Sequence, residues 1–238
     1  MRFKRATAAA AALACGGVAL SACGAKAYVP LTAANIGSTM AAATKNLHSA
    51  HVVSTGNGAT TTIDFDNSDA LKYRVTESAG SQAVIGIGSV RYLQYPGAVP
   101  EGKWLKVPST SSAGTLNFSD LDPIAMVVRF NKGLKKFAYL GATKISGTQV
   151  QHYRITIDQQ KYLQATGQGL GSANLGWSET LTEDLYLNND NTLRRVTLSL
   201  PGGVGNTEVD VTNWGKPTMI QAPPASAVVT SVQPSKNK

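Results

Sequence analysis

The side chains that most often perform enzyme chemistry are sparse in this sequence and form no familiar catalytic pattern. The three histidines, His48, His51 and His152, show neither H-E-x-x-H nor another paired spacing that suggests zinc. No G-x-S-x-G motif marks a nucleophilic serine. His48 and His51 stand where the first predicted helix ends and can cap its carbonyl groups, whereas His152 lies on the polar face of a predicted strand.

The acidic residues do not make a stronger case. Asp64, Asp66 and Asp69 resemble part of a calcium loop, but the glycine and the distal glutamate of that motif are missing, so a strand end and a polar turn explain them better. Glu179 and Glu183 can form a carboxylate pair on one strand face, but no other sign of a cleft accompanies them. We therefore expect no enzyme activity, no metal and no cofactor.

One thiol does stand in a distinctive setting. A basic start is followed by a short run of small and apolar residues over 6–20, which is typical of a secretory signal and too short and alanine-rich to span a membrane. The run ends in Leu20-Ser21-Ala22-Cys23, which looks like a bacterial lipobox. In such a motif the Cys23 thiol takes a diacylglyceryl group, and cleavage leaves the cysteine as the N-terminus. The alternative is an ordinary signal peptide with an incidental cysteine.

Cleavage before Cys23 would change the composition of the chain. It removes 1–22, including Cys15, and leaves 216 of the 238 residues, which suits one domain held together by burial and hydrogen bonds without disulfides. Loss of Arg2, Lys4 and Arg5 lowers the formal net charge from +8 to +5. This charge is mild and includes no dense basic cluster, so nucleic acid is not an expected partner. A lipidated, palmitate-carrying protein would lie at the extracytoplasmic face of the cell membrane.

The mature chain begins with a predicted tether and helix. The segment 23–32 is short and mixed in composition, and it would connect the membrane to the domain. A helix is expected over 33–47 with Thr32 as its N-cap, because apolar residues recur at helical spacing, at Ile36, Met40, Ala43 and Leu47. One face of this helix would pack on a sheet. The alternative is a helix that lies on the membrane surface.

From residue 49 onward the apolar period changes to two, which predicts strands. Short turn-forming segments separate them, so the strands should form antiparallel meanders. After Pro217 the chain becomes rich in Pro, Ser and Ala, and we expect a disordered tail over 223–238, leaving 33–222 as the folded domain. The predicted strands are 51–55, 60–65, 71–76, 82–87, 90–95, 103–107, 139–145, 149–157, 180–187, 193–200 and 207–213.

A further helix is predicted in the middle of the chain. Asp122 would cap it and Pro123 would occupy its first position. The residues that follow are apolar on more than one side, which means either simple burial, the reading that the sequence favours, or the lining of an apolar cavity. These apolar residues are Ile124, Val127, Val128, Leu134 and Phe137, with Gly133 as a kink or break.

The order of these features resembles that of the actinobacterial lipoproteins of the LppX/LprG group. The resemblance covers about 33–224, and its motifs are diffuse and structural rather than catalytic. The segments that carry it are the lipobox, Leu47-His48-Ser49-Ala50-His51-Val52, Ser89-Val90-Arg91-Tyr92-Leu93, Gly102-Lys103-Trp104, Leu121-Asp122-Pro123, the hairpin that begins Lys144-Ile145-Ser146-Gly147, and Thr212-Asn213-Trp214-Gly215-Lys216-Pro217.

This resemblance implies an α+β, LolA-like fold, in which a strongly curved antiparallel half-barrel sheet wraps a few helices, including the N-terminal helix. It also implies a non-enzymatic, membrane-anchored lipoprotein that carries an acyl lipid or glycolipid within the cell envelope, with a membrane transporter as a further candidate partner. The alternative is an anchored interaction protein with a closed core. Under the carrier hypothesis the cavity would be lined by Ile124, Val127, Val128, Leu134 and Phe137.

Overall fold

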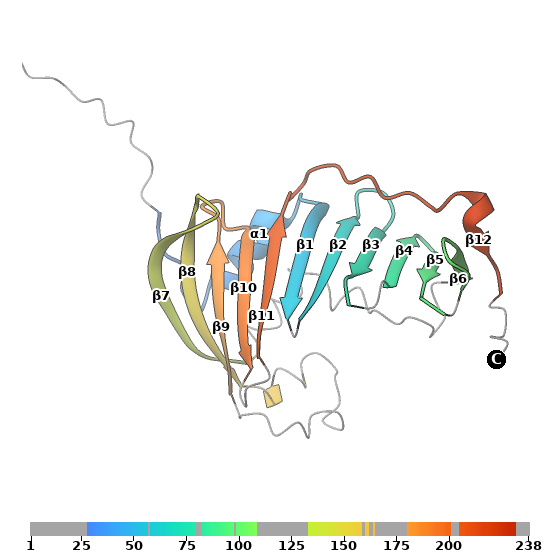
Figure 1. Cartoon of the computed structure of the whole chain (residues 1–238). Coiled ribbons are helices and arrows are strands. Elements are labelled where there is room, and N and C mark those ends of the chain that lie inside the picture. Colours follow the sequence, from blue (N-terminus) through green and yellow to red (C-terminus); the bar gives the residue numbers. More distant parts are fainter. Residues whose placement is uncertain are drawn as a thin grey trace, which may run out of the picture.

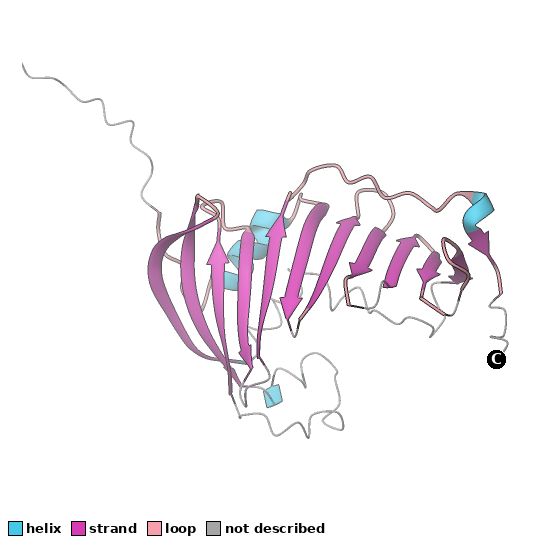
Figure 2. Ribbon diagram, viewed as in Figure 1, coloured by secondary structure: helices cyan, strands magenta, loops and turns pink. Residues whose placement is uncertain are grey.

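The computed structural model describes residues 28–56, 58–79, 82–97, 99–108, 133–158, 160–161, 164, 180–200 and 205–231. Most of this part of the chain belongs to one sheet, with α1 (Ile36–Thr44) packed on one face and a short 3-10 helix, η3 (Ala225–Ala227), near the end of the chain (Figure 2). The strands are β1 (Ser49–Gly56), β2 (Ala59–Asp66), β3 (Lys72–Glu77), β4 (Gln82–Ile87), β5 (Val90–Gln94), β6 (Trp104–Pro108), β7 (Leu134–Ile145), β8 (Thr148–Asp158), β9 (Thr180–Leu187), β10 (Leu193–Leu200), β11 (Gly205–Thr212) and β12 (Val228–Val229).

The sheet has twelve strands in the order β12-β6-β5-β4-β3-β2-β1-β11-β10-β9-β8-β7, and it is not closed into a barrel. Two antiparallel meanders, β1 to β6 and β7 to β11, are joined where β1 pairs with β11. All pairs are antiparallel except β12 with β6. Figure 1 shows the resulting long, curved sheet, with β7 at one edge and β12 at the other. The predicted antiparallel sheet and its meanders are confirmed.

Alternation of side chains gives this sheet an apolar inner face, on which α1 packs through Ile36 and Met40. One row of directly opposed residues crosses this face from β11 to β6, and each member is buried or packs on the core. The row is Val211, Val52, Ile63, Val75, Val84, Leu93 and Leu105. Its continuity explains why the strands keep one register, because a slip by one residue would turn these side chains to the outer face.

The helix α1 is shorter than the range 33–47 that its spacing predicted, and it begins with a different cap. Asn35, not Thr32, is the N-cap residue. The side-chain oxygen of Asn35 accepts a hydrogen bond from the Thr32 backbone N–H at 2.7 Å, and the Thr32 carbonyl accepts one from Ile36 N–H at 3.0 Å. The Thr32 prediction was wrong because a turn over 32–35 takes up these groups before the helix starts.

Two residues assigned from the sequence to the mid-chain helix lie instead in the edge strand β7. Leu134 pairs with Ile157 and Phe137 with Ile155, and a bulge separates the two pairs. The bulge inserts one extra residue, so side chains three positions apart face the same side of the strand. This spacing imitates a helical period, which is why the sequence prediction failed here. The remaining predicted members of that helix, 122–128, lie outside the described residues.

Two terminal segments, part of the predicted tether and part of the predicted disordered tail, contact the folded domain. Residues 28–32, part of the predicted tether, pack through Tyr28 and Leu31 on the core. Residues 223–231, predicted to be disordered, contain η3 and β12, and Lys103 Nζ donates a hydrogen bond to the Ser226 carbonyl at 2.8 Å. Their Pro-rich composition led to the wrong prediction for 223–231, because such a segment can be fixed by one strand pairing to β6. The last residues, 232–238, lie outside the described part.

Candidate functional site

The inner face is a continuous apolar surface in the described part of the chain, and it is our candidate site. Near β7 it is formed by aromatic and aliphatic side chains, with Phe137 on Ile155 and Tyr139 on Tyr153 in directly opposed pairs. The rings of Phe137 and Tyr153 have their centroids 5.4 Å apart, and those of Tyr139 and Tyr153 are 5.1 Å apart. Such tilted contacts at short range stabilise a rigid aromatic cluster.

Tyr153 fixes the N-terminal segment to this cluster. Its hydroxyl is fully buried, lies 2.8 Å from the Tyr28 hydroxyl and accepts a hydrogen bond from Leu31 N–H at 3.0 Å. The Tyr28 hydroxyl donates to Asn191 Oδ1 at 3.0 Å, so the hydrogen of the first contact comes from Tyr153. Burial raises the pKa of Tyr28. The Tyr28 hydroxyl therefore stays neutral, and together the two hydroxyls join β8, the β9–β10 turn and the segment before α1.

Glu183 is the most unusual residue of the inner face. It lies on β9 between Ile155 of β8 and Leu198 of β10, and it is only 3% exposed. Its Oε2 atom is buried and has no hydrogen-bond partner. Burial in these apolar surroundings raises the pKa of Glu183 to about 8. At neutral pH the carboxyl is therefore mostly protonated, and it offers one uncharged hydrogen-bond donor within an apolar surface.

Arg91 brings a second polar group to the same face, in the other meander. It lies on β5 opposite Gly86 of β4 and Val107 of β6. Its Nε and Nη1 atoms are buried without hydrogen-bond partners. Unpaired buried donors cost free energy, so a guanidinium in this state favours an oxygen-rich ligand group. The inner face thus combines a long apolar surface with one neutral acid and one cation.

The outer face of β8 and β9 is polar, as alternation along 149–157 predicted, and its ionisable side chains contact one another across the strands. His152 Nε2 lies 2.9 Å from Asp184 Oδ1, and Arg154 reaches the same carboxylate with two nitrogens at 2.9 and 3.0 Å. The His152 ring stacks on Tyr186 with centroids 4.4 Å apart. Every group here is engaged with a neighbour, which indicates a structural cross-strand network rather than a catalytic centre.

A second network on the outer face joins β10 and β11. Arg195 contacts both carboxylate oxygens of Asp210 at 2.7 Å and Glu208 at 2.8 Å, while Arg194 reaches Asp210 at 2.6 Å. Partial burial tends to raise the pKa of Asp210, but the hydrogen bonds and charges of Arg195 and Arg194 outweigh it, and the pKa is lowered overall. This arrangement stabilises the ionised carboxylate and the pairing of the two strands.

The aspartates that resemble part of a calcium loop have other roles. Asp64 of β2 lies 2.6 Å from His51 Nδ1 of β1, so His51 does not cap the first helix. Asp66 accepts hydrogen bonds from the backbone and the hydroxyl of Ser68 at 2.9 and 2.7 Å. The strand-end and turn interpretation is confirmed. Among the described residues, no group of three or more His, Cys, Asp or Glu side chains is placed to hold a metal ion.

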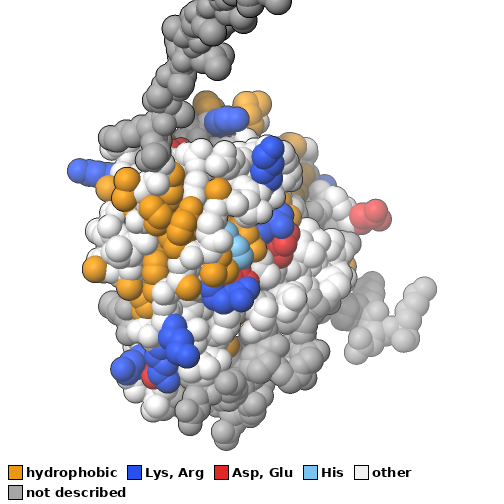
Figure 3. Space-filling view, turned by 90° about the vertical axis from the view of Figure 1, so that its left-hand side faces the viewer, with side chains coloured by type: hydrophobic (Ala, Val, Ile, Leu, Met, Phe, Trp, Pro, Cys, Tyr) orange, Lys and Arg blue, Asp and Glu red, His pale blue; other side chains and the backbone are white. Residues whose placement is uncertain are grey.

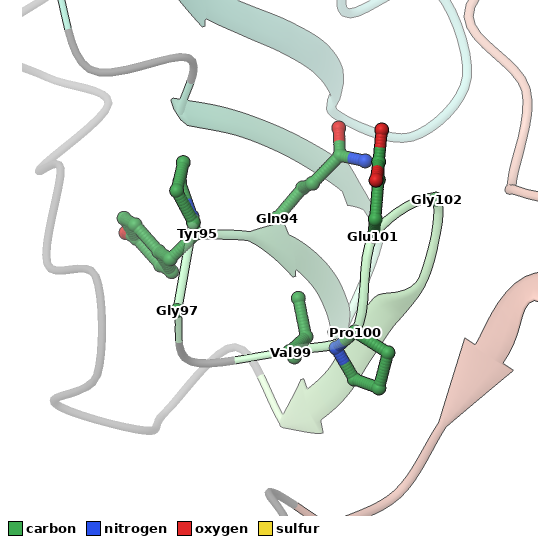
Figure 4. Close-up of a pocket in the computed structure, with 8 residues that line it drawn as sticks. Gln94, Tyr95, Gly97, Val99, Pro100, Glu101 and Gly102 are labelled. Atoms are coloured by element: carbon green, nitrogen blue, oxygen red, sulfur yellow. The ribbon is translucent and has the colours of Figure 1, made fainter. Parts of the chain in front are cut away.

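A small cleft lies beside the β5–β6 connection, with a volume of about 470 Å³. Gln94 and Glu101 extend to one side of it, and Tyr95 lies on the other (Figure 4). Tyr95 also packs on the core, so the cleft borders one end of the inner face. Its walls come from a single loop and are about as polar as apolar, which suits an acyl chain less well than the inner face does. The lining residues are Gln94, Tyr95, Pro96, Gly97, Val99, Pro100, Glu101 and Gly102.

The sequence-based site prediction is covered only in part by the described residues. Leu134 and Phe137 are partly buried and pack on the core from the inner face of β7, although on a strand and not on a helix. Cys23, Ile124, Val127 and Val128 lie outside the described residues. No helix in the described part is long and apolar enough to cross a membrane.

Sequence reasoning missed Glu183 and Arg91 as features of the inner face. In β9, Glu183 falls in the same alternating register as Leu181, Leu185 and Leu187, and Arg91 shares its register with Leu93. A charged residue in an apolar register is the signal that could have identified both.

The fold is shared with solved structures of mycobacterial lipoproteins. LprF from Mycobacterium bovis is 19% identical, with a TM-score of 0.56 over 80% of this chain and 96% of that protein. LppX from Mycobacterium tuberculosis is 15% identical, with a TM-score of 0.55 over 79% of this chain and 98% of that protein. No protein-family model matches the sequence, and no curated protein does. The chain therefore has the fold of the LppX/LprG-type lipoproteins, as its motif order predicted.

Proposed function

We propose that this protein is an extracytoplasmic lipoprotein that binds an acylated lipid or glycolipid on the inner face of its sheet and carries it within the cell envelope. The observation that carries the proposal is the continuous apolar inner face, found on a fold shared with LprF and LppX. Burial contributes about 0.8 kcal/mol for each methylene removed from water, so such a face can hold acyl chains.

The polar groups of this face suit a lipid with an oxygen-rich head. The neutral carboxyl of Glu183 can donate a hydrogen bond to an ester oxygen, and Arg91 can bind a phosphate or another anionic group. The open edges of the sheet would also help a lipid to enter and leave, because β7 and β12 can move apart without breaking a strand pair.

The lipobox supports membrane anchoring. A diacylglyceryl group and an added palmitate on Cys23 would hold the protein at the outer side of the cytoplasmic membrane, since two or more acyl chains give stable attachment. We also propose that the protein has no enzymatic activity and binds no cofactor. A membrane transporter that loads or unloads the lipid remains a proposed partner.

The proposal is tested by native mass spectrometry of the mature protein with Cys23→Ser, produced in an actinobacterial host, followed by solvent extraction. Replacing Cys23 keeps the lipid of the anchor out of the result. We expect discrete added masses that extract as acyl lipid. A clean apo mass with no uptake of offered lipids would refute the carrier function and favour the alternative, an anchored interaction protein with a closed core.

A pair of variants on one strand locates the bound lipid. Phe137→Lys places a charge on the inner face of β7, whereas Ala138→Lys places the same charge at an exposed neighbouring position opposite Arg154. We expect about a tenfold loss of copurified lipid only in the first variant, because a charge is costly next to acyl chains. Circular dichroism and thermal unfolding check that both variants fold. Equal lipid content in the two folded variants would place the lipid elsewhere.

A further inference from the structure

The point at which the chain leaves the domain toward Cys23 is fixed on the sheet. Tyr28 donates a hydrogen bond to Asn191 and lies 2.8 Å from the Tyr153 hydroxyl, so this end of the tether cannot move freely. Its ring also lies against Tyr139 of β7, with centroids 6.5 Å apart. The tether therefore meets the folded domain beside the edge strand β7.

The distance from this point to the proposed anchor is short. Tyr28 is the fifth residue after Cys23. A fully extended chain advances at most about 3.6 Å per residue, so the Cα atom of Cys23 can lie no more than about 18 Å from the Cα atom of Tyr28. This is less than the length of a long strand such as β7, which has 12 residues. Attachment at Cys23 thus holds the Tyr28 corner of the domain close to the bilayer.

The surface beside this corner is unusually apolar for an exposed region. In the described part of the chain four large hydrophobic residues are exposed, and three of them gather here: Val29 at 76%, Leu140 at 48% and Tyr139 at 38%. Leu140 projects because β7 bulges between Tyr139 and Gly141. Figure 3 shows this side of the molecule, where hydrophobic side chains form a patch with Lys and Arg side chains around it.

The same strand carries positive charge. Lys136 and Lys144 are exposed on β7, and neither makes an ion pair with a described residue. Lys135 is paired with Asp158 at 3.2 Å. β7 is also an open sheet edge, with hydrogen-bonding groups that no other described strand covers. Lysines on an open edge discourage pairing with a second copy and are attracted to anionic lipid headgroups.

We infer that the β7 edge patch, made of Val29, Lys136, Tyr139, Leu140 and Lys144, docks onto the anionic phospholipid surface of the membrane to which the protein is attached. Tyr139 suits the headgroup region, Leu140 enters the acyl boundary, and the two lysines contact phosphates. This inference rests on the anchoring at Cys23 in the proposed function. It adds that the aromatic end of the inner face, at Phe137 and Tyr139, faces the bilayer. Lipid can then pass between the bilayer and the inner face without crossing open water.

Single-cysteine labelling tests this orientation on the full, lipid-modified protein. The sequence contains only Cys15, which is removed with the signal, and Cys23, which the anchor blocks, so a new cysteine is the only reactive thiol. An environment-sensitive fluorophore is attached at Leu140→Cys or, as the matched control, at Lys106→Cys, an exposed position on β6 next to the opposite edge. Both proteins are placed in vesicles of phosphatidylcholine and phosphatidylglycerol that contain acyl-chain-brominated lipid.

We expect brominated lipid to quench about half of the emission at position 140 and little at position 106, since only a label at the acyl boundary meets the bromine atoms. Lys136→Glu with Lys144→Glu should weaken the quenching at position 140, whereas Lys106→Glu should not. Equal quenching at both positions, or none at either on vesicle-bound protein, would overturn the inference and leave lipid carriage intact. Energy transfer between labelled molecules without quenching would assign the patch to a second copy and also overturn it. A mass spectrum with unmodified Cys23 would overturn the anchor and this inference together.

Discussion

Replacement of Glu183 by glutamine is expected to stabilise the lipid-free protein, and to do so more strongly as the pH rises. Burial raises the pKa of Glu183 from its ordinary 4.5 to about 8, so the folded protein holds this proton more tightly than the unfolded chain does. The part of the stability that depends on Glu183 is therefore highest below pH 4.5, where its carboxyl is protonated in both states. It falls as the pH rises toward 8, where the folded carboxyl also ionises, and Glu183 causes no further loss above that.

The size of the effect follows from the same two pKa values. Each pKa unit corresponds to about 1.36 kcal/mol, so a rise from 4.5 to about 8 lowers the free energy of unfolding by about 5 kcal/mol across this window, and by about 3 kcal/mol at pH 7. Because Glu183 is 3% exposed, little solvent screening reduces this value. Glu183→Gln keeps the shape of the side chain and removes its titration, so the variant should not lose this free energy of unfolding as the pH rises.

Urea unfolding of delipidated protein, followed by circular dichroism at several pH values from 4.5 to 8.5, measures the difference between the two proteins. Subtraction cancels the titration of all other groups, and Glu101→Gln, at an exposed position in the β5–β6 connection, is the matched control that should show no such trend. A constant difference between wild type and Glu183→Gln across this range would refute the reasoning, because it would mean that the carboxyl titrates normally in the folded state. If the difference in unfolding free energy between the two proteins shrank with rising pH, the predicted direction of the pKa shift would be refuted.

Two other changes have expected outcomes. Gly86→Ala would place a Cβ against the Tyr73 ring, so we expect the free energy of unfolding in urea to fall by about 1–3 kcal/mol. A double variant with Tyr73→Leu should recover part of this loss, and equal losses with and without Tyr73→Leu would contradict the packing argument. Asp210→Asn removes the carboxylate that binds Arg194 and Arg195 and should cost about 1–3 kcal/mol at pH 7. Because the pKa of Asp210 is lowered in the folded protein, this carboxylate stabilises the fold above its ordinary pKa of 3.8. The stabilisation is lost as the pH falls through the pKa of the folded state. If Asp210→Asn destabilised the protein as much at pH 2 as at pH 7, the ion-pair argument would be contradicted.

Local patterns were enough to predict most of the strands. A period of two in the apolar residues identifies a strand and the face it buries, because successive side chains point to opposite sides whatever the strand pairs with. Thus Val52 and Ile63 lie on the inner face, and His152 on the outer face with its charged neighbours. The lipobox at Cys23 is likewise read from adjacent residues alone, and its lipidation remains a prediction.

Tertiary structure decided what depends on distant or irregular pairing. The pairing of β1 with β11 joins residues as far apart as His51 and Thr212, 161 positions along the chain, and no local pattern encodes such a partner. The bulge after Leu134 brings residues three positions apart to one face, so a strand imitated a helix. The apolar register of β9 marks Glu183 in the sequence, but only the apolar neighbours supplied by β8 and β10 make it a neutral acid, because a pKa is set by the surroundings in space rather than by the order of residues.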